Sequence, residues 1–552
     1  MSYGDVVYAS LAQLSVTGIA NKQVNSLASA VVDVFSSSFL SSTPFALSHS
    51  RTVDDDAQVT KSSNKIKTFV PPRAFDILTH CYVAMELPGL IDVHTDGTGA
   101  DREVVCDFAD IPAADRANDG DGTHLNNYVV SPLAMSRYHN SVATRACESV
   151  VLRIGGNEIA QVNSLYMYVL EELMGTPGKR SYDLTGKVLG HDIAMDDIML
   201  AAAAGADRAS AAATRTAGTR ALEQESTRRR RLYLPLPFWF TRGLESALKL
   251  ISIQLHRIEF TVNMRALSDC IFEQTSGDAF QIAKAGDGTL SIGAAITGTR
   301  AVAVREGEAV PLQQGGLDGY LTGHVRTGVP IQRGPSAKSS SALSARFGLD
   351  WSGVFLGNAK RQELLSLDER QLMSYMQEDV APAIDKAGMK TRNLDFQNAI
   401  YELLIAVVNT SDASRDPWGL DGTGIDTSNN LHEDALTTLD FTIASTSRTP
   451  AKQEGAYFRQ VSQYQTAGLI SGKQGLYYYP FHSTERSELN SNFLVSGYLN
   501  ASKIDDLRMR FTPNTHSFQG SSTIANNATV HTFARTLNLL TVRNGQAGRS
   551  FQ

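Results

Sequence analysis

The residues most suggestive of chemistry are four Asp-Gly-Thr tripeptides. They begin at Asp96, Asp121, Asp287 and Asp421. A recurrent aspartate is the kind of residue that can serve as a catalytic acid or base. The same tripeptide is also a standard turn sequence, because Asp hydrogen-bonds its own backbone and Gly accepts positive φ angles. We interpret all four as turns.

A calcium site is a second candidate, in residues 118–122 (Asn-Asp-Gly-Asp-Gly). Closely spaced oxygens suit a hard cation, but the full loop spacing and the distal bidentate acid are missing. Residues 468–474 are one residue short of a P-loop, and His432-Glu433 has no second histidine four residues on. No Gly-x-Ser-x-Gly motif occurs. We predict no catalytic, cofactor-binding or metal-binding residue, and a protein that is not an enzyme.

Charge argues against a nucleic-acid partner. The formal net charge is -7 at pH 7, which disfavours attraction to a phosphate backbone. The run of arginines at residues 228–231 could bind phosphate, act as a localisation signal or end a solvated loop, and we favour the loop end. Glycosylation acceptor motifs begin at Asn409, Asn500 and Asn527, but they matter only if the chain enters the secretory path.

Length and composition indicate a soluble protein of two to four domains. The chain has 552 residues, of which 42% are hydrophobic and 19% charged. No secretory signal or membrane-spanning apolar run is recognisable. The cysteines form no Cys-x-x-Cys pair, so we interpret them either as free thiols in a reducing compartment or simply as small buried side chains. They are Cys81, Cys106, Cys147 and Cys270.

Period-two alternation of apolar and polar residues is the strongest structural pattern. It predicts strands at residues 81–87, 150–154, 256–265 and 506–511, each with one buried and one wet face. Gly155-Gly156-Asn157 should form a hairpin turn. Short helices are expected at residues 164–174, 243–250 and 367–377. Many strands with a few inserted helices favour β-sandwiches over an α/β sheet.

An internal echo indicates a duplicated fold. Residues 232–239 (Leu-Tyr-Leu-Pro-Leu-Pro-Phe-Trp) resemble residues 476–482 (Leu-Tyr-Tyr-Tyr-Pro-Phe-His), and each copy precedes an alternating strand. Each proline should lie at a strand end or edge, where a missing N–H is tolerated. Chance alone can produce such an echo. We assign Pro235, Phe238 and Trp239 to closing the first domain's core.

An ordered series of motifs resembles the major capsid proteins of the nucleocytoplasmic large DNA viruses. Individually the motifs are short, but together they run through most of the chain in the family's order. Departures include Val495 for a proline, Ala501 for an aromatic residue, an altered stretch at residues 544–546, and residues 266–344, which have no counterpart. The matching segments are residues 73–78, 82–90, 148–159, 165–186, 234–260, 365–370, 457–465, 496–505 and 534–550.

The resemblance implies an all-β fold with short inserted helices, made of two consecutive eight-stranded jelly-roll β-sandwich domains. It places an N-terminal arm at residues 1–42 and the first roll at 43–268, with an Ala/Arg-rich insertion at about 192–231. A Gly/Ser/Thr/Ala-rich insertion follows at 269–344, and the second roll occupies 345–552.

The function implied is that of a major capsid protein. Homotrimers of pseudo-hexagonal outline would tile the icosahedral outer shell of a virion assembled in the host cytoplasm. The partners implied are further copies of this chain, minor capsid proteins, a penton protein and, indirectly, an inner viral membrane. No cofactor is expected. The alternatives are a minor or paralogous double jelly-roll capsid protein, or a β-sandwich enzyme or carbohydrate-binding protein that uses Trp239, Trp351 or Trp418.

Overall fold

The structure is a computed structural model that describes most of the chain. The described residues are 44–95, 101–105, 128–130, 137–174, 182–187, 229–272, 279–284, 290–296, 299–304, 340–341, 343–366, 368–384, 388–409, 418, 420, 425–426, 431–432, 434–443, 446–447, 453–467, 473, 475–482, 497–504, 506–513 and 528–551.

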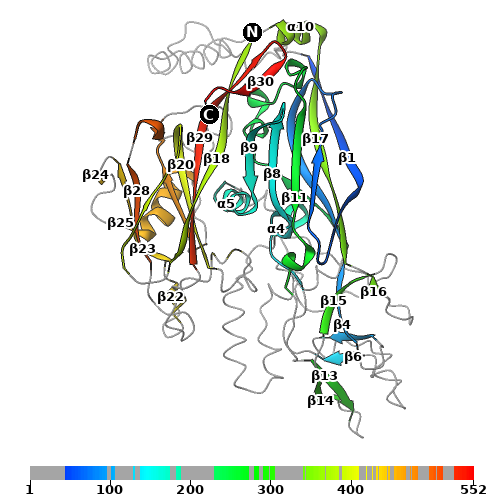
Figure 1. The fold of residues 1–552 in the computed structure, drawn as a ribbon. Coiled ribbons are helices and arrows are strands. Elements are labelled where there is room, and N and C mark those ends of the chain that lie inside the picture. The colour runs from blue at the N-terminus through cyan, green and yellow to red at the C-terminus, as the bar shows by residue number, and fades with distance from the viewer. Residues whose placement is uncertain are drawn as a thin grey trace, which may run out of the picture. The chain divides into compact units, whose positions relative to one another are not determined.

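The first sandwich consists of two four-stranded sheets that face each other across an apolar core (Figure 1). One sheet has the order β1 (Phe45–Thr60), β17 (Ser344–Leu356), β3 (Ile77–Leu87), β10 (Arg230–Pro235). The other has the order β2 (Lys65–Phe69), β11 (Ile258–Met264), β8 (Cys147–Ile154), β9 (Asn157–Asn163). Strand β11 alternates between fully buried and half-exposed residues along its whole length, as its period-two sequence predicts.

The second sandwich repeats this arrangement with the same strand order. Its sheets are β18 (Glu369–Ile384), β29 (Ala528–Arg543), β20 (Ala399–Asn409), β26 (Leu476–Pro480), and β19 (Lys390–Asn393), β28 (Leu507–Pro513), β23 (Leu436–Ile443), β24 (Thr446–Ser447). Short strands β25 (Gln453–Glu454), β27 (Leu499–Asn500) and β30 (Gln546–Arg549) pair with β23, β20 and β29. The predicted all-β fold of two eight-stranded jelly rolls is confirmed.

The internal echo proves to be structural. The echoed segments contain β10 and β26, which occupy the same edge position in their sheets. Pro235 and Pro480 are the last residues of these two edge strands, as expected for residues without an N–H. The alternating strands that follow, β11 and β28, are likewise equivalent. The echo therefore marks a duplicated fold.

A third, seven-stranded sheet is built from two insertions into the first sandwich. Its order is β14 (Leu290–Ile296), β13 (Ala279–Lys284), β6 (Tyr128–Val130), β5 (Asp101–Val105), β4 (Leu90–Thr95), β15 (Thr299–Val304), β16 (Ser340–Ser341). Two-stranded pairs join β12 (Ile271–Phe272) to β7 (Arg137–Tyr138), and β21 (Ile425–Asp426) to β22 (Leu431–His432). The Gly/Ser/Thr/Ala-rich insertion predicted at residues 269–344 thus contributes several strands.

The pairing of β17 differs from the expected domain boundary. We assigned residues 345–552 to the second roll, but β17 lies between β1 and β3 in the first sandwich. Its partner strand β3 lies far upstream, so local patterns could not reveal the pairing. Strand β10 begins at Arg230, close to the predicted end of the Ala/Arg-rich insertion at about residue 231. The arm at residues 1–42 lies outside the described residues.

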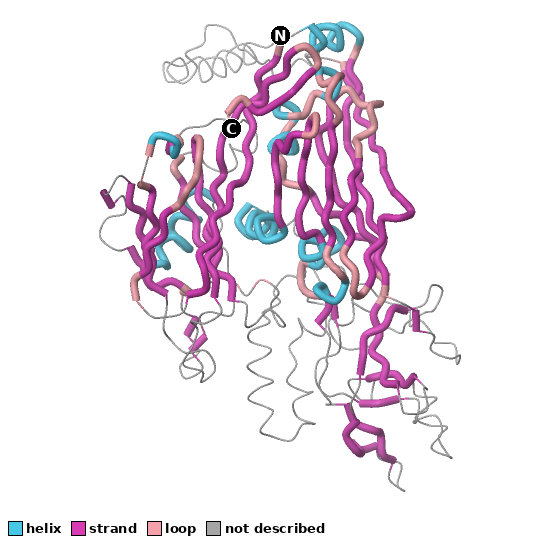
Figure 2. Tube along the Cα trace, in the orientation of Figure 1, coloured by secondary structure: helices cyan, strands magenta, loops and turns pink. Residues whose placement is uncertain are grey.

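Helices are few and short, as Figure 2 shows. Helix α5 (Ser164–Met174) confirms one prediction. The helix predicted at 367–377 is wrong, because β18 begins at Glu369 and pairs with β29 over most of its length; helix α10 (Asn358–Ser366) precedes it. Within 243–250 only a 3-10 turn forms, because Leu248 makes a bridge to Leu78 instead. Tertiary pairing overrides local propensity in both places.

The remaining helical segments are one or two turns long. They are α4 (Val142–Ala146), α6 (Tyr182–Thr185), α11 (Ser462–Ala467), the π-helical turn η9 (Tyr457–Val461), and the 3-10 turns η4 (Trp239–Thr241), η5 (Leu244–Ser246), η6 (Leu250–Ser252), η7 (Leu267–Cys270) and η10 (Ala501–Lys503). Among the described residues, no helix has the length and apolar character needed to cross a bilayer.

Aromatic side chains close the first core. Phe238 and Trp239 are buried, and the Phe260 ring lies 5.8 Å from Phe238 and 5.0 Å from Trp351, in edge-to-face geometry. The predicted core role of Phe238 and Trp239 is confirmed. For Pro235 it is wrong, because this residue is exposed at the end of β10.

Candidate assembly surfaces

The sheet β18-β29-β20-β26 is buried on both faces. Leu403 and Ile405 of β20 face the core of the second sandwich, whereas Leu404 and Ala406 join the apolar cluster that includes the first sandwich. On this outer face the Tyr166 ring of α5 lies 5.6 Å from Phe533 of β29. The two rolls therefore share a packed interface within one chain.

Tyr168 of α5 and Asn163, the last residue of β9, also contact the second roll. The Tyr168 ring stacks on Trp418 with centroids 5.0 Å apart. The Asn163 amide donates to Glu378 of β18 at 2.7 Å. Aromatic stacking and a hydrogen-bonded rim are features of stable interfaces.

A buried polar cluster lies on the same outer face. The Glu402 carboxylate is fully buried and forms an ion pair with Arg535 of β29. The Tyr478 hydroxyl donates to Glu402 at 2.6 Å, and His482 lies 3.2 Å from that hydroxyl. A buried carboxylate must be paired and hydrogen-bonded, and here both conditions are met.

The neighbouring Tyr401 connects this cluster to the first roll. The register of β20 against β29 shifts between Ile400 and Glu402, so Tyr401 is the extra residue of a bulge. Arg242, which follows η4 of the first sandwich, donates to the Tyr401 hydroxyl at 3.0 Å. Burial raises the pKa of Tyr401, so its hydroxyl stays neutral.

The connection between β10 and β11 is hydrogen-bonded to the C-terminal hairpin formed by β29 and β30. The Leu255 N–H donates to the Gly545 carbonyl at 2.9 Å, and the Ala547 N–H donates to His256 Nδ1 at 3.2 Å. Lys249 forms an ion pair with Glu369 at the start of β18. The segment 232–265 therefore builds the first core and also ties the rolls together.

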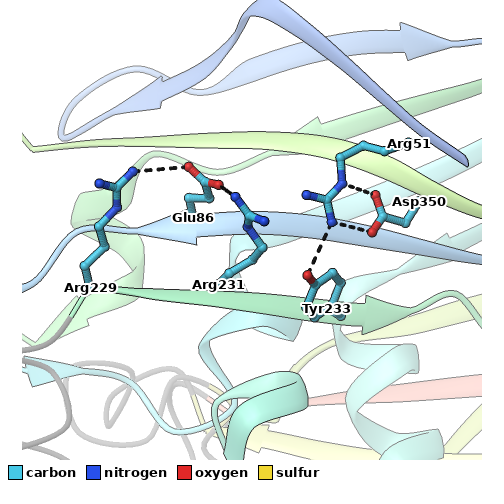
Figure 3. A network of polar contacts seen from close by, with 6 residues as sticks. All are labelled: Arg51, Glu86, Arg229, Arg231, Tyr233 and Asp350. Atoms are coloured by element: carbon cyan, nitrogen blue, oxygen red, sulfur yellow. Dashed lines mark hydrogen bonds and ion pairs between the residues drawn. The ribbon is translucent and has the colours of Figure 1, made fainter.

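The outer face of β1-β17-β3-β10 carries a ladder of polar contacts, drawn in Figure 3. Arg51 of β1 makes a bidentate pair with Asp350 of β17, with both N–O distances 2.5 Å, and donates to the Tyr233 hydroxyl at 3.3 Å. These bonds raise the pKa of the Arg51 guanidinium. Farther along the face, Glu86 pairs with Arg231 and, at 3.4 Å, with Arg229.

A hollow of about 680 Å³ opens on this face beside the Arg51–Asp350 pair. Its walls include aromatic rings and small hydroxyls from all four strands, together with Leu184 of α6. The lining residues are His49, Ser50, Arg51, Tyr82, Leu184, Tyr233, Asp350, Trp351 and Ser352.

Comparison with known proteins gives this architecture a family. A family model described as "Major capsid protein N-terminus" matches residues 120–298. A second, described as "Large eukaryotic DNA virus major capsid protein", matches residues 369–548. This chain belongs to the major capsid proteins of large eukaryotic DNA viruses.

Solved structures agree with this capsid protein in fold. The Faustovirus major capsid protein is 12% identical, with a TM-score of 0.58 over 95% of this chain and 94% of that one. PBCV-1 VP54 is 14% identical, with a TM-score of 0.57 over 94% of this chain and 100% of that one. None of the curated proteins compared matches the sequence.

The tryptophans of the capsid protein form no surface platform for sugars. Trp239, Trp351 and Trp418 are all buried. The Trp351 indole donates to the Thr52 hydroxyl at 2.9 Å, inside the first roll. The carbohydrate alternative loses the aromatic residues on which it depended.

Three of the cysteines and three residues of the arginine run lie in the described part of the capsid protein. Cys81, Cys147 and Cys270 are free and buried, and burial raises the pKa of Cys147 and Cys270 to about 12. In the arginine run, Arg229 precedes β10 and Arg231 lies within it; both pair with Glu86 and stay exposed, which agrees with the predicted solvated loop end.

Other predicted positions fall outside the described residues. They are the Asp-Gly-Thr aspartates at 96, 121, 287 and 421, the 118–122 segment, Cys106, Arg228 and Asn527. Within the part of the chain that the structure describes, no three His, Cys, Asp or Glu side chains gather closely enough to hold a metal ion.

Sequence reasoning missed the interface between the rolls. The apolar run at residues 400–408 was a usable signal, because strands buried on both faces lose their alternation. The buried acid within that run, Glu402, was a second signal, since a carboxylate at such a position requires a partner.

Proposed function

We propose that this major capsid protein assembles into homotrimers of pseudo-hexagonal outline that tile the flat facets of an icosahedral shell. The supporting observation is the identical strand order of the two sandwiches within one chain. Three copies would supply six similar units around a threefold axis, and closed symmetry prevents open fibres at the level of the capsomer.

The packing inside the chain supports a rigid building block. The outer face of β18-β29-β20-β26 is buried against α5, and the C-terminal hairpin is bonded to the β10–β11 connection. We expect large apolar burial inside the trimer and smaller, wetter contacts between trimers. Weak repeated contacts allow misplaced capsomers to dissociate before the shell closes.

Several partners and locations belong to the same proposal. We propose that the arm at residues 1–42 contacts minor capsid proteins, that a penton protein fills the vertices, and that an inner membrane is reached indirectly. We further propose that the insertions of the first roll form outward towers and clamps between subunits, and that assembly occurs in the host cytoplasm.

The deciding experiment combines light scattering with negative-stain imaging of the purified protein. We expect particles of three times the 59.8 kDa chain mass with a hexagonal outline. A persistent monomer would count against the trimer. Copy number in purified particles separates the major subunit from a minor paralogue, and glycan-array binding by a stable monomer would favour the carbohydrate-binding alternative.

A further inference from the structure

The duplicated fold gives each surface of one roll a counterpart on the other. Within the chain, α5 lies between β9 and β10 of the first roll and packs on the outer face of β29-β20-β26. The counterpart of α5 is the helical segment η9–α11, which precedes β26 in the second roll. The counterpart of the covered sheet is the β1-β17-β3-β10 face. Both halves of a second, equivalent contact are therefore present.

The η9–α11 segment carries an exposed apolar stripe. Tyr457, Val461 and Tyr464 are 37%, 40% and 65% exposed. Their spacing of four and three residues places them on one side of the segment, while Phe458 and Gln463 on the other side are buried in the second roll. In α5, by contrast, Tyr166 and Tyr168 are buried.

The strand register shows that the hollow lies on a row of paired residues, here called a rung, whose equivalent in the second roll is buried by the first. Pro235 pairs with Tyr82, which pairs with Asp350; the equivalent rung of the second roll joins Pro480, Glu402 and Arg535. That second-roll rung holds the buried ion pair, whereas Tyr82 and Asp350 line an open hollow.

The neighbouring rung has less side-chain bulk on the open face. It carries Ala84 and Gly348 where the second roll carries Leu404 and Phe533. Ala84 is already buried and a Cβ on Gly348 would meet the Thr52 carbonyl at 2.7 Å, so the room for an incoming tyrosine lies in the adjoining hollow. Tyrosine combines a large apolar ring with a polar tip, which suits a pocket lined by rings and hydroxyls.

Charge is compatible with such docking. The stripe Tyr457, Val461 and Tyr464 is neutral, and the charges of the hollow already neutralise each other in the bidentate Arg51–Asp350 pair. Covering the hollow would thus bury no unpaired charge. Helix α11 also lies beside α5, so the stripe borders the interface already formed within the chain.

We propose that the Tyr457–Val461–Tyr464 stripe of one copy docks into the hollow on the β1-β17-β3-β10 face of a second copy. This inference rests on the proposed homotrimer and names the contact that closes it. Around the trimer, a helical segment of each roll would then pack on the outer sheet face of the next roll. This contact would occur within one chain and between neighbouring chains in turn.

Photocrosslinking tests the contact directly. p-Benzoylphenylalanine replaces Tyr464 in ¹⁵N-labelled chains, which are unfolded together with unlabelled chains and refolded before irradiation. We expect crosslinks between labelled and unlabelled chains, on peptides containing Tyr82, Tyr233 or residues 350–352. The matched control places the same probe at Tyr498, an equally surface-exposed tyrosine at 60%, and should give no such crosslink.

A charge substitution gives the second measurement. Tyr464→Asp should raise the dissociation constant of the trimer about tenfold or more, because a carboxylate would be buried without a partner. Tyr498→Asp should leave it unchanged. Both variants should show the wild-type circular dichroism spectrum, since both tyrosines are exposed.

The two proposals fail in different ways. Wild-type trimers with Tyr464 crosslinks confined to the same chain, located on another surface or absent would overturn the docking contact and leave the trimer standing. Unchanged trimer stability in Tyr464→Asp would overturn it as well. A wild-type protein that stays monomeric would refute both.

Discussion

The buried ion pair between the rolls makes a sharp prediction for Arg535→Leu. Replacing the arginine leaves the Glu402 carboxylate buried without the guanidinium, beside the Tyr478 hydroxyl and His482 Nε2, which lies 3.5 Å away. Removing one partner of a buried pair costs about 3–5 kcal/mol of folding free energy. Because the pair faces the first roll, the loss should weaken the union of the two sandwiches.

An exposed pair supplies the matched control. Arg257 and Glu259 lie 3.0 Å apart on the wet face, with the arginine side chain 68% exposed. Arg257→Leu should cost only about 0–1 kcal/mol. The double variant Glu402→Leu with Arg535→Leu should recover much of the single-variant loss, because replacing both charges by apolar groups is often close to neutral.

Urea unfolding followed by tryptophan fluorescence is a suitable assay. Trp418 stacks on Tyr168 at the interface between the rolls, whereas Trp351 reports on the first core. We expect Arg535→Leu to unfold at a lower urea concentration than the wild type, with the fluorescence of Trp418 changing before that of Trp351. If Arg535→Leu lowers the free energy of unfolding no more than Arg257→Leu does, the Glu402–Arg535 pair does not hold the rolls together.

Three further predictions concern titration, a turn and an insertion. Burial raises the pKa of Cys147 and Cys270 to about 12, so their contribution to stability is fully present below the unfolded thiol pKa of about 8.5 and is lost as pH rises towards 12. Between pH 7 and 11 the melting temperature should therefore fall less steeply in Cys147→Ala than in the wild type. Parallel curves for the two proteins would contradict this. In thermal melts, Gly155→Ala should destabilise the protein by about 1–2 kcal/mol more than Gly156→Ala. Both glycines have positive φ, but only at Gly155 would the new Cβ meet the His256 ring, at 2.8 Å. Equal losses of stability in the two variants would exclude the clash. Deleting residues 311–341, of which 311–339 lie outside the described residues, should spare folding of the monomer but alter trimer stability or surface shape, as judged by circular dichroism and light scattering; an unfolded product would refute this assignment.

Local patterns were enough to identify the strands that have one wet face. In β11 and β28 every second residue is buried, so the period of the sequence is the period of the structure. The hairpin at Gly155-Gly156 was equally predictable, because both glycines adopt the positive φ that such turns require. The echo around Pro235 and Pro480 indicated the duplication before any strand pairing was known.

Only the tertiary structure decided which distant strands pair and which faces are covered. Strand β17 belongs to the first roll because its hydrogen-bond partners lie in β3, and no local pattern encodes a partner so far along the chain. Strand β18 resembled a helix start because its acidic residues suit a helix dipole, yet pairing with β29 prevailed. Glu402 and Arg535 are far apart in sequence, and only the pairing of β20 with β29 brings them together on the face that the first roll buries. Sequence determines the period of each element, whereas burial and pairing depend on what the rest of the chain places against it.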